Sequence, residues 1–124
     1  MDASFKTSGE YKAANLIAGN FPRVERKLTI AAGTGELLPG AVFALEGDGK
    51  AVLVDSASVT PSVQNPVGIL AHEVDALDAD AEAIVYYAGE FNELELTFGG
   101  TDDADTHRDA LRRLGIFLTT NIGA

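Results

Sequence analysis

The sequence has 124 residues, no cysteine and a formal net charge of −10, with 19 acidic and 9 basic side chains. This length predicts a single domain, and the lack of cysteine excludes disulfides, thiolate metal sites and cysteine nucleophiles. The negative charge argues against nucleic acid or an anionic membrane surface as a partner, because both would repel it. Since 46% of the residues are apolar, the chain is expected to fold.

Residues 1–22 are predicted to form an extended arm. Neither a helical nor a strand period fits the apolar residues of this segment. Solvated tails rarely carry large apolar side chains, so these are candidate anchors for a partner: Phe5, Tyr11, Leu16, Ile17 and Phe21. A frayed terminus and a tail packed on its own domain are the alternatives. The first eight residues lack the apolar stretch of a signal peptide, which favours a soluble protein made in the cytoplasm.

Strands are predicted in the first half of the remaining chain, residues 23–124. Residues 24–30 alternate between two faces, as in a strand. Residues 41–45 and 51–54 flank the sequence Glu-Gly-Asp-Gly-Lys, which predicts a hairpin because Asp-Gly supplies turn residues with positive φ. Residues 67–71 are short and apolar, which is typical of a buried strand.

An acidic segment and a second pair of strands are expected next. Residues 72–82 are acidic and are predicted to be a loop or an edge segment. Residues 82–87 and 91–98 are predicted to be two strands on either side of Ala-Gly-Glu. The alternation of apolar and polar residues in the second of these suits an antiparallel sheet with one solvated face.

One helix is predicted, over residues 103–114. Aspartates stand at its first turn and arginines towards its last, both placed favourably for the helix dipole, and Gly115 is placed to end it. Its apolar stripe contains Ala110, Leu111 and Leu114, with His107 on the same side as a partly covered surface residue. Residues 116–119 then form a last short strand. The fold is therefore mainly β.

Histidines offer little support for catalysis or for a metal site. His72 stands beside Glu73, which could orient it as a general base, but a solvated loop histidine is the favoured interpretation. Neither His72 nor His107 has a second histidine at ligand spacing, so no zinc site is expected.

Carboxylates and hydroxyls also lack the patterns of known sites. Asp75, Asp78, Asp80 and Glu82 form an oxygen-rich run, in which the spacing of the last three resembles the start of a calcium loop. The sharp-turn glycine and the closing glutamate are missing, so a solvated acidic loop is favoured. The serines of the polar connection have no base nearby in the sequence: Ser56, Ser58 and Ser62. No phosphate loop, nucleophile elbow or dinucleotide fingerprint occurs. No catalytic residue and no cofactor is therefore expected.

Several segments together resemble the phage head decoration protein D family, whose best-known member decorates the lambda head. They are Asn-Leu-Ile-Ala-Gly-Asn-Phe-Pro at residues 15–22, Pro-Val-Gly-Ile-Leu-Ala at 66–71, Val-Tyr-Tyr-Ala-Gly-Glu-Phe-Asn at 85–92 and Leu-Arg-Arg-Leu-Gly-Ile-Phe-Leu at 111–118. Their order and spacing cover nearly the whole chain from residue 15, and the similarity is stronger to the prophage-type branch of the family than to the lambda protein.

The resemblance implies a structural role on a virion. Family members have a β-clip-like fold and form trimers at the three-fold and quasi-three-fold positions of the expanded head. They bind its outer surface and reinforce it against the pressure of packaged DNA. The implied partners are the major capsid protein and two further copies of the chain, and residues 1–22 would be the capsid-binding arm of a decoration domain at 23–124.

Two other functions stay open at this stage. A different phage or surface structural module, such as a tail or adhesion domain, could share the β framework. A small trimeric enzyme is a further alternative, because nucleotide-hydrolysing trimers also use the β-clip fold and a fold alone does not fix a function.

Overall fold

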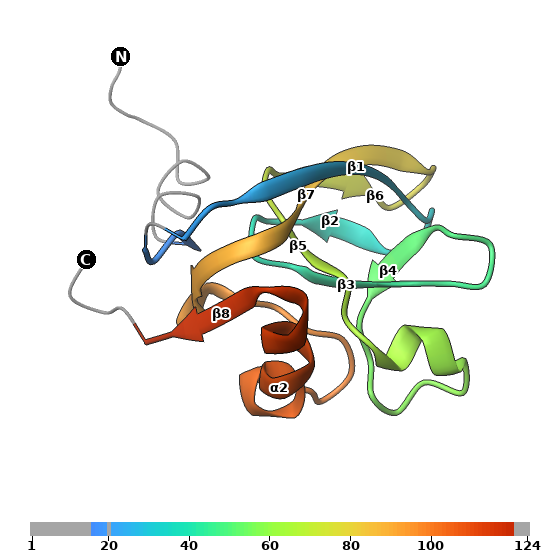
Figure 1. Cartoon of the computed structure of the whole chain (residues 1–124). Helices are drawn as coiled ribbons and strands as arrows, with labels where there is room; N and C mark the ends of the chain where they lie inside the picture. Colours follow the sequence, from blue (N-terminus) through green and yellow to red (C-terminus); the bar gives the residue numbers. More distant parts are fainter. Residues whose placement is uncertain (1–15, 20, 121–124) are drawn as a thin grey trace, which may run out of the picture.

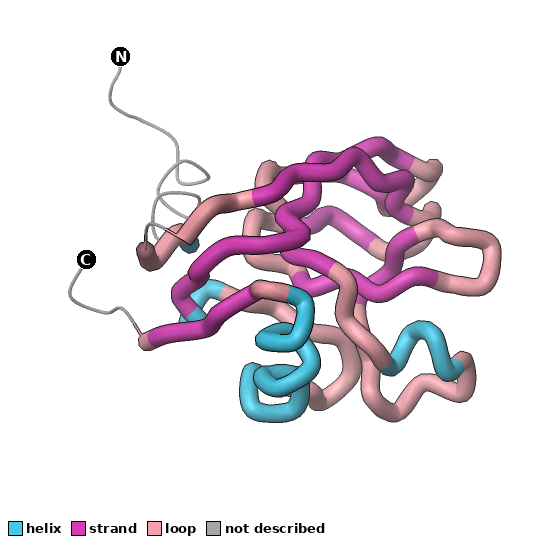
Figure 2. The backbone as a smooth tube through the Cα atoms, in the orientation of Figure 1, coloured by secondary structure: helices cyan, strands magenta, loops and turns pink. Residues whose placement is uncertain are grey.

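Strands are the main regular structure in the computed structural model, which describes residues 16–19 and 21–120. Figures 1 and 2 show a curved sheet with a helix packed on one side. The elements are β1 (Val24–Ile30), β2 (Gly35–Leu37), β3 (Val42–Leu45), β4 (Ala51–Leu53), the 3-10 turn η1 (Pro61–Gln64), β5 (Gly68–Leu70), β6 (Val74–Ala76), β7 (Ala81–Asn92), η2 (Glu93–Glu95), α2 (Ala104–Leu114) and β8 (Ile116–Thr119). The prediction of a mainly β fold with a helix in the second half is confirmed.

The main sheet closes on itself. Its strand order is β1-β4-β3-β5-β7-β8, and β1 also pairs with β7, so β1, β4, β3, β5 and β7 form a ring. The β1–β7 pair extends along the whole of β1, whereas β1 and β4 share a single registered pair, Ile30 with Ala51. Strand β8 lies outside the ring, parallel to β7. A separate two-stranded sheet joins β2 and β6.

Two apolar cores lie on opposite faces of this sheet. Successive residues of a strand point to opposite faces, and Val42 and Phe43 of β3 accordingly enter different cores, as do Ile69 and Leu70 of β5. The barrel core draws on every strand of the ring: Ile30, Leu37, Ala41, Phe43, Ala51, Leu70, Ala76, Ala83 and Val85. The helix core lies beneath α2: Leu16, Val42, Ala44, Val54, Ile69, Phe91, Leu111 and Ile116.

The expected strand pair around Ala-Gly-Glu is wrong. The chain does not reverse there but continues as the single strand β7, and η2 follows from Glu93. Gly89 has a φ of 146°, and the alternation of side chains between the two faces is interrupted near it. Val85 and Phe91, six residues apart, would lie on the same face of a regular strand, but Val85 faces the barrel core and Phe91 faces the helix core. Because β1 pairs with the first part of β7 and β8 with the last part, tertiary pairing holds the strand straight where the local sequence predicted a turn.

The remaining predicted elements agree with the structure. The hairpin is β3–β4, in which Gly49 has a φ of 90°. Helix α2 begins after Asp103, which forms a reciprocal capping box with Thr106, and ends at Gly115 in the left-handed conformation. His107, expected at the surface, is buried with 3% exposure. Within the described part of the chain, no helix is long and apolar enough to cross a membrane.

Candidate functional site

The inner end of the predicted arm is attached to the domain through β7. Ile17 forms an antiparallel bridge with Phe91, and the amide of Ala18 donates a 3.0 Å hydrogen bond to the carbonyl of Glu90. These contacts continue along the side of β7 that β1 occupies. Residues 17 and 18 are therefore held beside the end of β7 (Figure 1).

The predicted anchors fall in different environments. Phe5 and Tyr11 lie outside the described residues. Leu16 is 1% exposed and packs in the helix core, Ile17 is half-buried, and Phe21 is 42% exposed. In this conformation Leu16 therefore belongs to the domain, and Phe21 is available at the surface. Their use in binding a partner remains a prediction.

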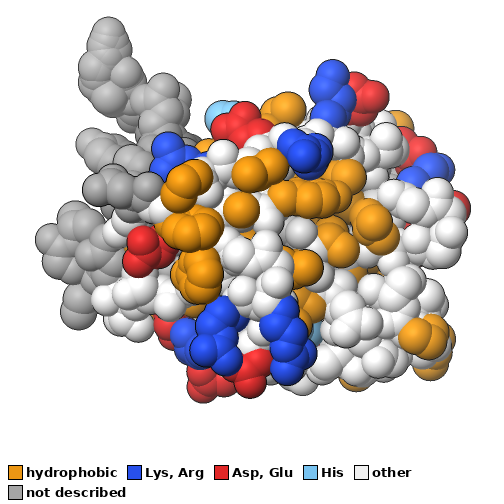
Figure 3. All heavy atoms as spheres, in the orientation of Figure 1, with side chains coloured by type: hydrophobic (Ala, Val, Ile, Leu, Met, Phe, Trp, Pro, Cys, Tyr) orange, Lys and Arg blue, Asp and Glu red, His pale blue; other side chains and the backbone are white. Residues whose placement is uncertain are grey.

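Phe21 sits at the edge of a mixed apolar and basic surface. Its ring meets that of Phe117 edge to face, with 4.9 Å between centroids. Val24 is 38% exposed and Arg23 is exposed beside it. We call these four residues the arm-base surface. Figure 3 shows hydrophobic side chains in a band across this face of the molecule, with Lys and Arg side chains gathered below it over β8 and α2.

Phe117 was not identified from the sequence as part of a surface. It belongs to β8, whose Ile-Phe-Leu-Thr sequence predicted a strand but could not show which neighbour would cover each face. The available signal was the absence of any charged residue in that strand.

Arginines line a groove between α2 and β8. The guanidinium of Arg108 donates to both carboxylate oxygens of Glu93 at 2.8 and 3.1 Å, and to Asp105 at 2.7 Å. The hydrogen bonds that Arg108 donates to Glu93 and Asp105 raise the pKa of Arg108, and the one to Glu93 lowers the pKa of that carboxyl group. Arg108, Asp109 and Arg112 of α2, with Phe117 and Leu118 of β8, enclose about 180 Å³.

A second polar group lies beneath α2. The carboxylate of Asp102 accepts hydrogen bonds from the amide of Ser56 at 2.7 Å and from its hydroxyl at 2.6 Å. The Nε2 atom of His107 contacts the same carboxylate at 2.7 Å. Phe98 stacks on the imidazole, with 5.6 Å between ring centroids. Burial acts to raise the pKa of Asp102, but the hydrogen bonds from Ser56 and His107 outweigh it and lower that pKa.

The cluster of Ser56, Asp102 and His107 connects the segment after β4 to α2, and its geometry does not activate the serine as a nucleophile. In a serine hydrolase the histidine takes the proton of the serine hydroxyl, whereas here the Ser56 hydroxyl and His107 both bind the carboxylate of Asp102. The sequence separation of Ser56 and Asp102 hid this cluster, because the fold alone brings them together.

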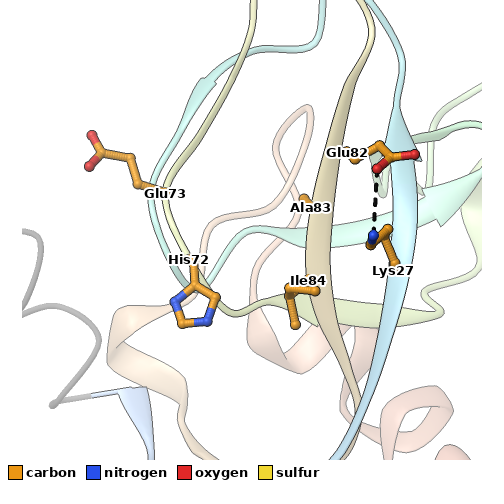
Figure 4. A pocket seen from close by; sticks show the side chains of 6 residues that line it. All are labelled: Lys27, His72, Glu73, Glu82, Ala83 and Ile84. Carbon is orange, nitrogen blue, oxygen red and sulfur yellow. Dashed lines mark ion pairs between the residues drawn. The ribbon is translucent and has the colours of Figure 1, made fainter.

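The groove beside His72 is open to solvent. It holds about 300 Å³ between Lys27, His72, Glu73, Glu82, Ala83 and Ile84. Figure 4 shows Glu73 pointing away from His72, while Lys27 and Glu82 pair across the neighbouring strands at 3.7 Å. The structure therefore does not bring His72 and Glu73 together as a base and its orienting carboxylate.

The acidic run supports turns and ion pairs. Asp75 accepts from the amide of Leu77 at 3.1 Å. Asp80 pairs with Lys50 at 2.7 Å and accepts from the amide of Ala32 at 2.8 Å, so it connects three turns at one end of the barrel. Among the residues that the structure describes, no group of three or more His, Cys, Asp or Glu is placed to hold a metal ion.

Comparison with known proteins identifies the family. No curated protein matches the sequence. Residues 6–117 match the family described as bacteriophage lambda head decoration protein D, and this match covers nearly all of the described domain together with part of the predicted arm. Its members are structural proteins of the phage head. The chain belongs to the bacteriophage lambda head decoration protein D family.

Proposed function

We propose that this protein forms trimers on the outside of the mature, expanded phage head, at its three-fold and quasi-three-fold positions, and reinforces the head against the pressure of packaged DNA. The observation that carries the proposal is the family match over residues 6–117. In this proposal residues 1–22 are the capsid-binding arm of a β-clip-like domain, and the major capsid protein is the partner.

The arm-base surface supports this proposal because it combines exposed apolar side chains with the place where the arm leaves the domain. Phe21 and Val24 are 42% and 38% exposed, and Phe117 lies against Phe21. Apolar side chains exposed together often mark a protein interface. Seating this surface on the shell would bring the arm to the shell as well.

Binding of this kind stabilises the head without chemistry. Ordering an arm costs about 1–2 kcal/mol per residue in backbone entropy, which pairing with a sheet edge and burial of apolar anchors must offset. A trimer brings three arms to one site at a high effective concentration. A protein that binds the mature lattice and not its disrupted form stabilises the lattice by mass action.

Co-sedimentation with phage particles tests the proposal. The intact protein is mixed with undecorated mature heads and with immature shells, next to a variant that lacks residues 1–15. This truncation ends before Leu16 because Leu16 belongs to the helix core. We expect saturable binding of the intact protein to mature heads only, and loss of that binding in the truncated variant. Failure of the intact protein to bind mature heads would overturn the proposal.

Single substitutions then test the anchors. Replacement of Phe5, Tyr11 or Phe21 by alanine is expected to weaken head binding by at least about tenfold where the ring is buried against the shell. Val59→Ala is the matched control, because Val59 is 97% exposed in the loop between β4 and β5. Equal binding by all four variants would remove these residues from the interface.

A further inference from the structure

Among the described residues, no strand pairs with the outer edge of β8. The amide of Gly89 donates to the carbonyl of Gly115 at 3.1 Å, and Gly89 is registered with Ile116. In a parallel ladder the residues that bond to the neighbouring strand alternate, so Phe117 and Thr119 turn their backbone groups towards β7 while Ile116 and Leu118 turn theirs away. No backbone hydrogen bond joins β8 to any described element other than β7.

The arginine-lined groove runs along this free edge. Successive strand residues point to opposite faces, so a hollow lined by both Phe117 and Leu118 lies at an edge of β8 and not over one face. No residue of β7 lines it, which leaves the unpaired edge. The opposite wall is one face of α2, formed by Arg108, Asp109 and Arg112.

The sequence of β8 carries none of the residues that usually protect an edge against strand addition. Natural edge strands carry charged residues, proline or bulges that prevent pairing with another chain. Strand β8 reads Ile-Phe-Leu-Thr, without charge or proline. By contrast, the strands of the small β2–β6 sheet carry Glu36 and Asp75. An unprotected edge beside a groove is suited to receiving an extended segment.

Charge selects the occupant. The chain has a net charge of −10, yet this groove places Arg108 and Arg112 beside the edge, and Arg113 follows on the exposed side of α2. Arg112 is only loosely paired, at 3.5 Å from Asp109, and its side chain is 67% exposed. A second β8 could not complement these cations, because it has no carboxylate and would bring a second set of arginines with it.

We propose that the free edge of β8 binds an extended segment of the capsid shell protein that carries Asp or Glu side chains. The segment adds as a further strand through the outward backbone groups of Ile116 and Leu118, and its carboxylates meet Arg112 and Arg113. The proposal rests on the proposed function for the identity of the partner, and it adds a contact separate from the N-terminal arm.

Hydrogen exchange on the full-length protein tests this contact directly. The free protein and the protein bound to mature heads are compared by mass spectrometry, with attention to the amide of Leu118, which points away from β7. We expect rapid exchange of this amide in the free protein and at least tenfold slower exchange on heads. Unchanged exchange at Leu118 on heads that are saturated with protein would overturn the proposal.

Two variants give an independent measurement. Leu118→Pro removes an outward donor and leaves the bonds of Phe117 and Thr119 to β7 in place, and Arg112→Glu reverses the charge without touching the strand. Each is expected to bind heads about tenfold more weakly than the wild type. Val59→Ser, in a loop away from β8, is the control with unchanged binding. Circular dichroism checks the fold of each variant. If Leu118→Pro does not fold, the head binding of Arg112→Glu alone tests the proposal.

The outcomes separate this contact from the proposed function. Binding by the wild type with equal binding by both variants overturns the contact and leaves decoration standing. Failure of the wild type to bind overturns both. A change in the oligomeric state of free Leu118→Pro, measured by analytical ultracentrifugation, would show that a second copy covers the edge and would overturn the proposal.

Discussion

The carboxylate of Asp102 lies 2.7 Å from Nε2 of His107, and each side chain is 4% exposed. Asp102 precedes α2 and His107 is inside it, so the contact fixes the first turns of the helix. The same carboxylate holds Ser56 of the segment after β4. A single buried carboxylate thus ties α2 to the sheet that it covers.

Removal of this charge should destabilise the domain. Asp102→Asn replaces an acceptor oxygen with an amide NH2 group, which faces a donor from Ser56 or His107 and leaves a buried polar group unsatisfied. We expect a loss of about 2 kcal/mol in the free energy of unfolding, measured by urea denaturation. The control is Asp109→Asn on the exposed side of α2, where the ion pair with Arg112 is 3.5 Å long and a change below about 0.5 kcal/mol is expected. Equal effects of the two substitutions would contradict the role of Asp102.

The same carboxylate should make the domain sensitive to acid. Its hydrogen bonds lower the pKa of Asp102 in the folded protein, against the opposing effect of burial. A group with a lowered folded pKa stabilises the protein above its unfolded pKa, here 3.8, and that contribution is lost as the pH falls through the folded pKa. Glu93, whose pKa Arg108 lowers, acts in the same direction.

Unfolding measured from pH 6 downwards in the wild type and in Asp102→Asn tests this sensitivity. The stability difference between the two proteins is expected to be constant near neutral pH and to shrink as the pH falls through the acid range. A difference that grew with acidification would show that the folded pKa of Asp102 is raised.

Leu16 fixes the inner end of the predicted arm to the domain. It is 1% exposed and packs with Phe91 and Leu111 in the helix core, so Leu16→Ala should lower the free energy of unfolding by about 3 kcal/mol. Ile17→Ala, at a half-buried neighbour, should cost less. Thermal or chemical denaturation of the free protein gives both values. A Leu16→Ala variant as stable as the wild type would show that Leu16 does not contribute to the helix core.

Local signals in the sequence predicted the elements whose ends are set locally. Helix α2 begins after a capping aspartate and ends at Gly115. The β3–β4 hairpin turns at an Asp-Gly pair whose glycine has a positive φ. Both effects act within a few residues. These rules need no knowledge of the rest of the fold.

Features that depend on distant partners were predicted poorly. The sequence predicts His107 at the surface, because Asp102 and Phe98 enclose it only after folding. It also gives no sign that Leu16 is buried, because the strand and helix that cover it lie far along the chain. Ser56 has no candidate partner nearby in the sequence, so its hydrogen bonds to Asp102 cannot be predicted from it. The sequence also does not predict that one edge of β8 lacks a neighbour, because strand order is a property of the whole sheet.

Gly89 allows β7 to serve both cores. Its φ of 146° is one that other residues rarely adopt, and a Cβ built there would lie 2.7 Å from the Phe91 ring. Gly89→Ala should therefore strain the backbone and displace Phe91, with a loss of about 2 kcal/mol or more in the free energy of unfolding.

Gly47→Ala is the matched control for this substitution. Gly47 lies in the β3–β4 turn, where a Cβ would meet no atom within 4 Å, and a change within about 0.5 kcal/mol is expected there. Urea denaturation of both variants makes the comparison. If Gly89→Ala were as stable as Gly47→Ala, β7 would not need glycine to change faces, and the pairing of β1 and β8 with its two halves would be sufficient to hold it straight.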